Sequence, residues 1–470
     1  MLDSTETMRN EKIEEFTASI AGSVIGEADA GYDDARSVWN ASIDKHPAMI
    51  VRCKGVADVI RSVNFARQQG LLVALRGGGH NVAGNSTCDG GMVIDLGAMN
   101  GVHTDVGRRL VRVEGGATIR DVDRETQMFG LAVPLGIVSE TGIGGLTLCG
   151  GHSWLNRLHG FACDNLVSVD LVTAKGELVR ASEDEYPELF WAVRGGGGNF
   201  GIVTSFEFRA HSIGNMVTLC APFFPIDDGA RIMRAWRDYM ASAPDTFTAQ
   251  CLFWTIPAHE SFPADLHGRP VIVLAGVYCG PQEQAAAFVQ PLRDMGTPLV
   301  DLSGPIPYEA VQQAFDPHFT ARYKRFNYWK SLYMDALSDA TIDRIVARGM
   351  DRPNPWTLIS TRLMGGAPSR VDAGATALGG RDAAFMLSID TSWTDPEISD
   401  AAIAWTRSFW DEMKVGTGGS AYLNFLSDDD DHEALMRASY GQGAYDRLTA
   451  VKAQYDPGNF FSLNQNIPPK

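Results

Sequence analysis

The sequence lacks the features that mark a membrane-bound, secreted or nucleic-acid-binding protein. No apolar run is long enough to span a bilayer, and the polar N-terminus MLDSTETMRNEKIEEF has no apolar signal core. Basic residues are outnumbered, since 40 Lys and Arg stand against 57 Asp and Glu, for a formal net charge of -17. Because an acidic chain repels phosphate backbones, we expect neither nucleic acid nor a membrane as a partner.

Paired cysteines and metal-ligand spacings are also missing. The seven cysteines are odd in number and contain no CxxC pair, which is typical of a reducing, cytoplasmic compartment where thiols act as small core residues. The acidic run SDDDDHE (427–433) has no zinc or calcium spacing, and its repelling charges are typical of a solvated loop. We therefore expect no metal site.

Glycine, in contrast, is abundant and clustered. Of the 49 glycines, many fall in RGGGH (76–80), CDGG (88–91), TGIGGLTLCGGHSW (141–154) and RGGGGNFG (194–201), each beside an apolar segment. One such cluster is as compatible with a tight turn as with a ligand loop, but four of them favour close approach of the backbone to a ligand. Bare loop amides suit a phosphate, although the pattern is neither a Walker loop nor a dinucleotide GxGxxG fingerprint.

Hydrophobic periodicity predicts an α+β fold in more than one domain. Residues 1–45 look helical, 47–53 form a strand, 56–70 form a helix that ends at Gly70, and 165–182 form a hairpin around AKGE. After residue 213 the glycine clusters stop, and well-spaced strands alternate with helical stretches. A chain of 470 residues is too long for one ordinary core, so we expect a boundary near this point.

The order of four segments resembles one enzyme family. RGGGHN, then TGIGGLTLCGGHSW, then ELFWAVRGGGGNFGIVTSFEF, then YDPGNFFSLNQNIPP is similar to the berberine-bridge-enzyme-like FAD oxidases of the vanillyl-alcohol oxidase superfamily. The resemblance covers nearly the whole chain. It implies an FAD-binding domain over residues 1–213, a substrate-binding domain of antiparallel sheet backed by helices over 214–439, and a C-terminal return to the first domain over 440–470.

The resemblance also implies which residues hold FAD. His80 would carry a covalent bond to the flavin, although a lone histidine is more often structural. Val138 stands where many relatives have a second linking cysteine, so a single linkage is expected; Cys149 is read as a small buried thiol near the flavin. The implied FAD-binding residues are Arg76, Gly77, Gly78, Gly79, His80, Asn81, Ser86, Thr141, Gly142, Gly144, Gly145, Cys149, Gly151, His152, Asn199, Gly201, Val203, Asn464 and Asn466.

Candidates for the catalytic base lie in the second half of the chain. Tyr422 matches the tyrosine of the family's YxN stretch, with Asn424 expected on the same strand face, but a buried tyrosine bonded to a carbonyl is an equal alternative. Asp390 shares a strand face with Met386 and Ser388, and could be a base, bind a cationic amine, or simply face solvent at an edge. Tyr328 and Lys330 are weaker candidates.

The expected activity is oxidation of a CH–OH or CH–NH group of a small organic substrate. Dioxygen is the expected acceptor, with hydrogen peroxide as product, in a monomer or homodimer. The alternatives are a tailoring oxidase that cyclises or rearranges its substrate, a dehydrogenase with another acceptor, and a flavin-free binding protein that kept the fold.

Overall fold

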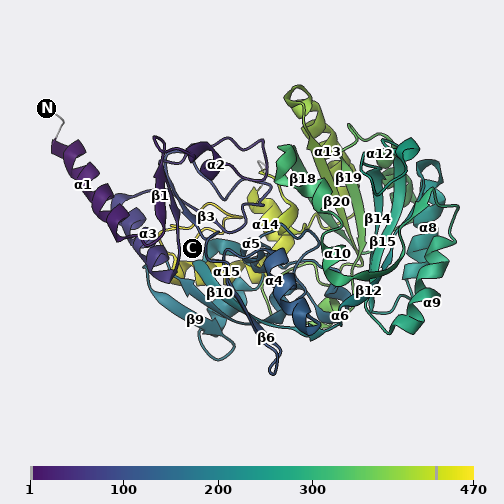
Figure 1. Cartoon of the computed structure of the whole chain (residues 1–470), viewed down its shortest axis with the longest axis horizontal. Coiled ribbons are helices and arrows are strands. Elements are labelled where there is room, and N and C mark those ends of the chain that lie inside the picture. The colour runs from purple at the N-terminus through teal and green to yellow at the C-terminus, as the bar shows by residue number, and fades with distance from the viewer. Residues whose placement is uncertain (1–3, 429–431) are drawn as a thin grey trace.

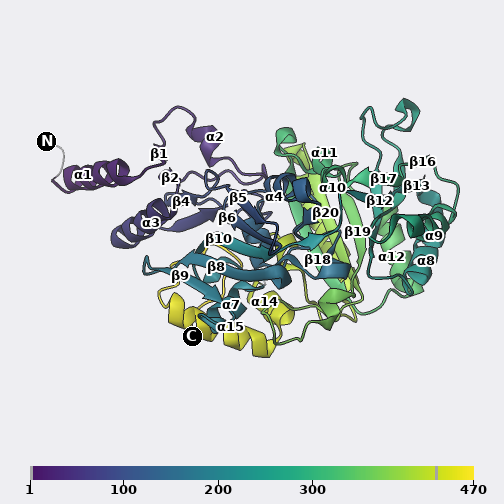
Figure 2. The same cartoon turned by 60° about the horizontal axis from the view of Figure 1, so that its bottom comes forward.

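The computed structural model of the chain describes residues 4–428 and 432–470. Figures 1 and 2 show two side-by-side parts, one built from the N-terminal residues and the C-terminal tail, the other from the middle of the chain. Helix α1 (Ser4–Ser19) projects from the first part. Within the described ranges, no helix has the length and apolar character needed to cross a bilayer. Residues 429–431 of the acidic run lie outside the described residues.

The first part begins with a small mixed sheet. Strands β2 (Met49–Arg52), β4 (Met92–Asp95) and β3 (Val73–Arg76) are parallel, and β1 (Ser23–Gly26) pairs antiparallel with β2. The helix predicted over 56–70 is confirmed as α3 (Val56–Gln69), capped by Gly70 in the left-handed region. A wholly helical start was wrong, because β1 and the short α2 (Tyr32–Arg36) follow α1.

A five-stranded antiparallel sheet adjoins it. Its order is β5-β6-β10-β8-β9, and the predicted hairpin is confirmed as β8 and β9. Helices pack on this sheet and share one apolar core with it. The strands are β5 (Val102–Asp105), β6 (Leu110–Glu114), β8 (Leu166–Val172), β9 (Leu178–Ser182) and β10 (Ile202–Arg209); the helices are α4 (Ile119–Thr126), α5 (Ile143–Leu148), α7 (Pro187–Val193), α14 (His432–Tyr440) and α15 (Gln442–Tyr455).

The second part is a nine-stranded antiparallel sheet. One face is apolar and packs on helices α8 (Gly229–Met240), α9 (Gln282–Arg293), α12 (Asp339–Met350) and α13 (Ser399–Lys414). The strands are β12 (Met216–Cys220), β13 (Pro222–Pro225), β14 (Phe247–Thr255), β15 (Pro270–Tyr278), β16 (Val300–Asp301), β17 (Gly304–Pro307), β18 (Phe326–Met334), β19 (Leu358–Leu363) and β20 (Phe385–Trp393).

Side chains along β20 alternate between the helix-covered face of the sheet and the opposite face. Phe385, Leu387 and Ile389 point into the helix-covered core. Asp390 therefore points the other way, and in the ladder it stands between Trp329 on β18 and Leu358 on β19. The predicted α+β fold, with a second antiparallel sheet backed by helices, is confirmed; the domain limits at residues 213 and 440 stay predictions.

Candidate active site

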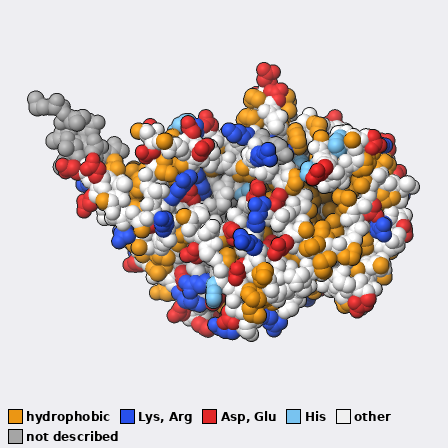
Figure 3. Space-filling model, viewed as in Figure 1, with side chains coloured by type: hydrophobic (Ala, Val, Ile, Leu, Met, Phe, Trp, Pro, Cys, Tyr) orange, Lys and Arg blue, Asp and Glu red, His pale blue; other side chains and the backbone are white. Residues whose placement is uncertain are grey.

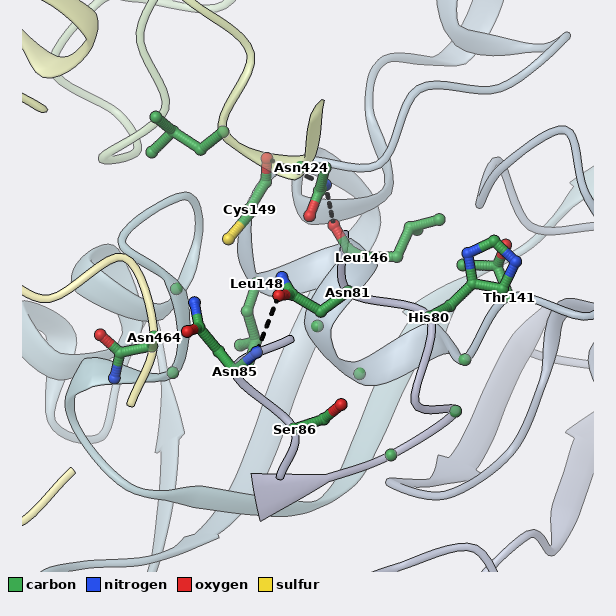
Figure 4. A pocket seen from close by; sticks show the side chains of 18 of the residues that line it. His80, Asn81, Asn85, Ser86, Thr141, Leu146, Leu148, Cys149, Asn424 and Asn464 are labelled. Carbon is green, nitrogen blue, oxygen red and sulfur yellow. Dashed lines mark hydrogen bonds between the residues drawn. The ribbon is translucent and has the colours of Figure 1, made fainter. Parts of the chain in front are cut away.

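A single long cavity collects side chains from both parts of the molecule. It encloses about 1680 Å³, including the part that is open to solvent. Its walls come from the loop after β3, from residues 136–149 around α5, from the turn at 422–425, from the C-terminal strap 461–465 and from the inner face of the nine-stranded sheet. Figure 4 shows the first of these loops, with the cavity-lining side chains of His80, Asn81, Asn85 and Ser86.

Two glycine loops touch backbone to backbone along one wall. A Cβ added to Gly78 would lie 2.4 Å from the backbone nitrogen of Gly142, and a Cβ on Gly142 would lie 2.3 Å from that of Gly78. Glycine is therefore required at both positions by packing. Gly145 and Gly198 also line the cavity, but nothing lies within 4 Å of an added Cβ there, so their backbone faces open space.

The cavity wall carries hydrogen-bonding groups without protein partners. No described residue accepts a hydrogen bond from the backbone N–H groups of residues 77–81. Buried polar atoms are almost always paired, so a cluster of unpaired ones around one cavity indicates a polar ligand that contacts several walls. The unpaired buried side-chain atoms on this wall are His80 Nε2, Ser86 Oγ, His152 Nδ1, Trp329 Nε1, Arg362 Nη1 and Asn464 Oδ1.

His80 is held in place by an aromatic stack. Its ring lies 4.3 Å from that of Trp39 at 20°. Trp39 is itself fixed, because its backbone N–H donates to Gly79 O (3.1 Å) and its indole Nε1–H donates to Phe319 O (2.5 Å). Burial lowers the pKa of His80 to about 4, so the imidazole is neutral at physiological pH and keeps a nucleophilic lone pair. Val138 also lines the cavity.

Tyr422 precedes a turn rather than sitting on a strand. The expectation of a shared strand face with Asn424 was wrong, because a 3-10 turn, η9 (Leu423–Phe425), follows Tyr422. The two side chains nevertheless meet: the phenol oxygen accepts hydrogen bonds from Asn424 Nδ2 (2.9 Å), Gly151 N–H (3.0 Å) and His152 N–H (3.1 Å). Burial raises the pKa of Tyr422 to about 12, while the Asn424 and Gly151 donors act in the opposite direction.

Asp390 is buried rather than solvent-facing. It is 1% exposed, lies on a central strand and lines the cavity. The hydroxyl of Ser388, two residues earlier on the same face, donates to Oδ1. Burial raises the pKa of Asp390 to about 6, opposed by the positive charge of Arg362 and by the Ser388 hydroxyl. The carboxyl group therefore titrates near neutral pH.

Comparison with known proteins identifies the family. Residues 47–182 match the family described as FAD binding domain, and residues 421–468 match the one described as Berberine and berberine like. The chain is 30% identical to (R)-6-hydroxynicotine oxidase of Paenarthrobacter nicotinovorans over 96% of this chain and 98% of that protein. The chain belongs to the berberine-bridge-like FAD-linked oxidoreductases. It is equally 30% identical to an FAD-linked oxidoreductase of Dictyostelium discoideum, over 97% of each.

Solved structures agree with this assignment. The present chain matches the crystal structure of 6-hydroxy-D-nicotine oxidase from Arthrobacter nicotinovorans with a TM-score of 0.85 and 28% identity, over 96% of this chain and 99% of that one. It shares its fold with BBE-like 1 of Physcomitrella patens, at a TM-score of 0.86 and 23% identity over 97% and 99%. FAD is therefore the cofactor of this family, and the glycine loops and unpaired polar atoms of the cavity fit a dinucleotide.

Most residues that the sequence predicted for the site of this FAD-linked oxidoreductase line the cavity. They are Gly77, Gly78, Gly79, His80, Asn81, Ser86, Thr141, Gly142, Gly144, Gly145, Cys149, His152, Val203, Asp390, Tyr422, Asn424 and Asn464. Burial raises the pKa of Cys149 to about 12, so this residue stays a thiol. Five predicted residues lie off the cavity wall: Arg76, Gly151, Asn199, Gly201 and Asn466.

Arg76 is the clearest of these five. Its guanidinium does not line the cavity and donates to the carbonyls of Ala35, Arg36 and Ser86, with Asp95 3.8 Å away. Arg76 therefore links the loop after β3, through Ser86, to the segment at residues 35–36.

Asn199 and Gly151 also act through other residues. Asn199 is buried; its Nδ2 donates to Gln465 O (3.1 Å) and its Oδ1 accepts from Ile467 N–H (2.9 Å), which ties the C-terminal strap to the turn at 197–199. Gly151 supplies one of the three N–H donors to Tyr422.

Sequence reasoning predicted Asp390 on the second sheet but named none of four further cavity residues from that sheet and its surroundings. Arg362, Trp329, Phe319 and Phe425 all line the cavity. The available signal was the alternation along β19, which places Arg362 on the same face as Ser360. In the ladder Arg362 pairs with Met386, so its side chain lies on the face of the sheet that lines the cavity. The weaker candidate Lys330 lies on the far face, with its Nζ 4.2 Å from the ring centre of Trp410.

Proposed function

We propose that this FAD-linked oxidoreductase oxidises a CH–OH or CH–NH group of a small organic substrate, with dioxygen as acceptor and hydrogen peroxide as product. One observation carries the proposal: a single cavity joins a loop of bare amides and a neutral histidine to a phenol oxygen that receives three N–H donors. The name of the 30% identical relative, an oxidase, supports the acceptor.

The cofactor would lie along the glycine loops. FAD, when bound, supplies the group that accepts a hydride from the substrate carbon. The unpaired amides of residues 77–81 are suited to its phosphates, and Ser86 and Asn464 offer further polar contacts. His80, held by Trp39, would carry the single covalent bond, since Val138 cannot form a thioether.

Tyr422 would take the substrate proton. A phenol that accepts three hydrogen bonds is stabilised in its ionised form, and this opposes part of the effect of burial. Asn424 holds the phenol from the same turn, while its Nδ2 also reaches Leu146 O at 3.1 Å. Asp390 is the other titratable acid on the cavity wall, and it is the alternative proton acceptor.

Partners and location follow the same proposal. On the face shown in Figure 3, acidic and basic side chains are interspersed among apolar ones, which suits a small-molecule substrate better than a polyanion. A cytoplasmic location is supported by the seven cysteines, each of which is a free thiol.

The test begins with His80→Ala. We expect the purified wild-type protein to give a yellow pellet after acid denaturation, and His80→Ala to release its flavin into the supernatant while oxidising substrate more slowly. His159→Ala is a matched control, because His159 stacks on His211 away from the cavity. Peptide mass spectrometry locates the adduct. A protein without flavin absorbance would contradict the enzyme proposal, and an adduct that survives in His80→Ala would contradict the choice of residue.

The acceptor needs its own measurement. After anaerobic reduction by substrate, air should restore the flavin absorbance with release of hydrogen peroxide. Slow return in air but rapid return with an artificial electron acceptor would instead favour a dehydrogenase.

A further inference from the structure

Arg362 is a buried cation that forms no direct ion pair with a described carboxylate, although Asp390 lines the same cavity. Its side chain is 4% exposed at the centre of the nine-stranded sheet. Nε donates to Gln250 Oε1 at 3.0 Å, whereas Nη1 has no partner. Among the described residues, no carboxylate oxygen lies within 4.0 Å of its guanidinium nitrogens, and Asp390 is the one carboxylate whose charge acts on it. A buried charge of this kind is costly unless a ligand pairs with it.

Aromatic rings surround this cation. The guanidinium carbon lies 4.8 Å from the ring centre of Phe425. Trp329 meets Phe425 edge-on at 5.6 Å and meets Phe319 edge-on at 5.6 Å, and all three rings line the cavity. The indole Nε1–H of Trp329 is a second buried donor without a partner. Flat apolar surfaces next to two free donors suit a planar ring that carries acceptor oxygens.

Among the described residues that line the cavity, Arg362 is the only basic side chain that stays charged and Asp390 is the only carboxyl group. Burial and the charge of Arg362 hold the pKa of His152 well below its ordinary value, so that ring adds no positive charge. Arg362 itself would repel an ammonium group placed against it. A carboxylate or phenolate would instead form a charge-assisted hydrogen bond with Nη1.

We propose, on the basis of the function proposed above, that the substrate is an aromatic molecule bearing an anionic oxygen group that Arg362 binds. The rings of Phe319, Trp329 and Phe425 hold the substrate ring, and Arg362 Nη1 together with Trp329 Nε1 bind its carboxylate or phenolate. The CH–OH or CH–NH group of the same molecule then faces Tyr422. Neutral sugars and cationic amines are the classes that this arrangement disfavours.

Three aromatic alcohols of one shape test the proposal. Flavin-loaded protein is mixed anaerobically with 4-(hydroxymethyl)benzoate, 4-methylbenzyl alcohol or 4-(aminomethyl)benzyl alcohol, and Kd is read from the dependence of the flavin absorbance change, or of the rate of flavin reduction, on concentration. We expect the carboxylate to bind at least about tenfold more tightly than the neutral alcohol, the equivalent of about 1.4 kcal/mol, and the ammonium compound most weakly. Equal affinities, or a preference for the ammonium compound, would overturn the proposal.

Variants assign the preference to one side chain. Arg362→Met should reduce the ratio of carboxylate to neutral affinities to about one, and Arg362→Lys should retain part of it. Lys330→Met is the matched control, because Lys330 is equally buried in the same sheet but faces away from the cavity, so the preference should persist. A preference that survives in Arg362→Met would overturn the assignment.

The outcomes separate this inference from the proposed function. A protein that binds no flavin contradicts the proposed function, whereas flavin-loaded protein without anion preference contradicts only the inference. Should Arg362→Met fail to fold, competition in the wild-type protein decides: benzoate should displace the neutral alcohol at lower concentration than benzamide does, and equal displacement would overturn the proposal.

Discussion

At the scale of single residues, Tyr422 carries the sharpest claim about chemistry. Replacing it with Phe removes the proton acceptor and leaves Asn424, Gly151 and His152 with unpaired donors. We expect flavin reduction by substrate to slow by about 10²–10⁴-fold, the usual contribution of a positioned base, with reoxidation by oxygen little changed. Stopped-flow absorbance measures both half-reactions separately.

The matched control is Tyr333→Phe. Tyr333 is another buried phenol in the same apolar cluster as Tyr422, but it does not line the cavity. Its loss should leave the reduction rate nearly unchanged. If Tyr422→Phe reduces its flavin as fast as the wild-type protein, the phenol has only a packing role.

Asp390 should make ligand affinity depend on pH. Above its pKa of about 6 the carboxylate is ionised and opposes an anion at Arg362; below that pKa it is neutral. The dissociation constant of benzoate should therefore rise by roughly threefold to tenfold as pH increases through about 6. Tyr422, with a pKa of about 12, and His152, with a pKa well below its ordinary value, line the same cavity and do not titrate there.

The variant Asp390→Asn should bind benzoate with an affinity that no longer changes across this pH range. A rate of flavin reduction that rises with pH through about 6, and loses that rise in Asp390→Asn, would instead identify Asp390 as the base. A flat wild-type affinity profile would show that the carboxylate does not sense the ligand.

Residue identities were readable from the sequence where a motif carries them. His80 and the glycines stand in ordered segments near the start of the chain, so their place on one cavity wall could be predicted. Arg362 has no such motif. Its role depends on the absence of a carboxylate within ion-pair distance, and that absence is set by which strands become neighbours.

At the scale of elements, periodic helices and strands were predictable, whereas a segment whose backbone is hydrogen-bonded by a side chain was not. Helix α3 and the β8–β9 hairpin follow from spacing alone. Tyr422 and Asn424 were predicted to lie on a strand, yet no strand ladder forms there. Ser331 takes the ladder's place: its Oγ accepts from Tyr422 N–H (3.0 Å) and donates to Tyr422 O (3.1 Å). Only the fold reveals such a substitution.

The contact between the two glycine loops gives a test at this scale. Gly142 has φ of -67°, which alanine adopts freely, so only the added Cβ at 2.3 Å from Gly78 N would disturb the structure. Gly142→Ala should therefore destabilise the protein by about 1–3 kcal/mol through overpacking and reduce its flavin content. Thermal unfolding and the ratio of flavin to protein absorbance measure the two effects.

Gly145→Ala separates packing from ligand contact. Its Cβ meets nothing within 4 Å, so apoprotein stability should not fall, whereas flavin content should fall if the cofactor occupies that space. Full flavin content in Gly145→Ala would place the cofactor away from this glycine, and an unchanged melting temperature in Gly142→Ala would contradict the loop contact.

At the scale of the whole molecule, the cavity is built from segments almost 400 residues apart. The C-terminal strap, drawn in yellow, returns to the N-terminal part and closes one wall with Phe461, Leu463 and Asn464. Its return was implied by family resemblance, but composition and periodicity could not have shown it, because the bonds that hold it are made by single buried side chains.

Lys452 is the centre of that closure. Its buried Nζ donates to Asp456 Oδ2 (2.7 Å), Asn199 O (2.8 Å) and Phe461 O (3.0 Å), so all three of its protons are used. Lys452→Met leaves Asp456 as an unpaired buried charge, a loss of about 3–5 kcal/mol for such pairs. We expect a lower melting temperature, faster proteolysis of the C-terminal strap and reduced flavin content. Lys470→Met, which removes an exposed pair with Asp446, should change none of these. Retained flavin and stability in Lys452→Met would mean that the strap is held by its apolar contacts alone.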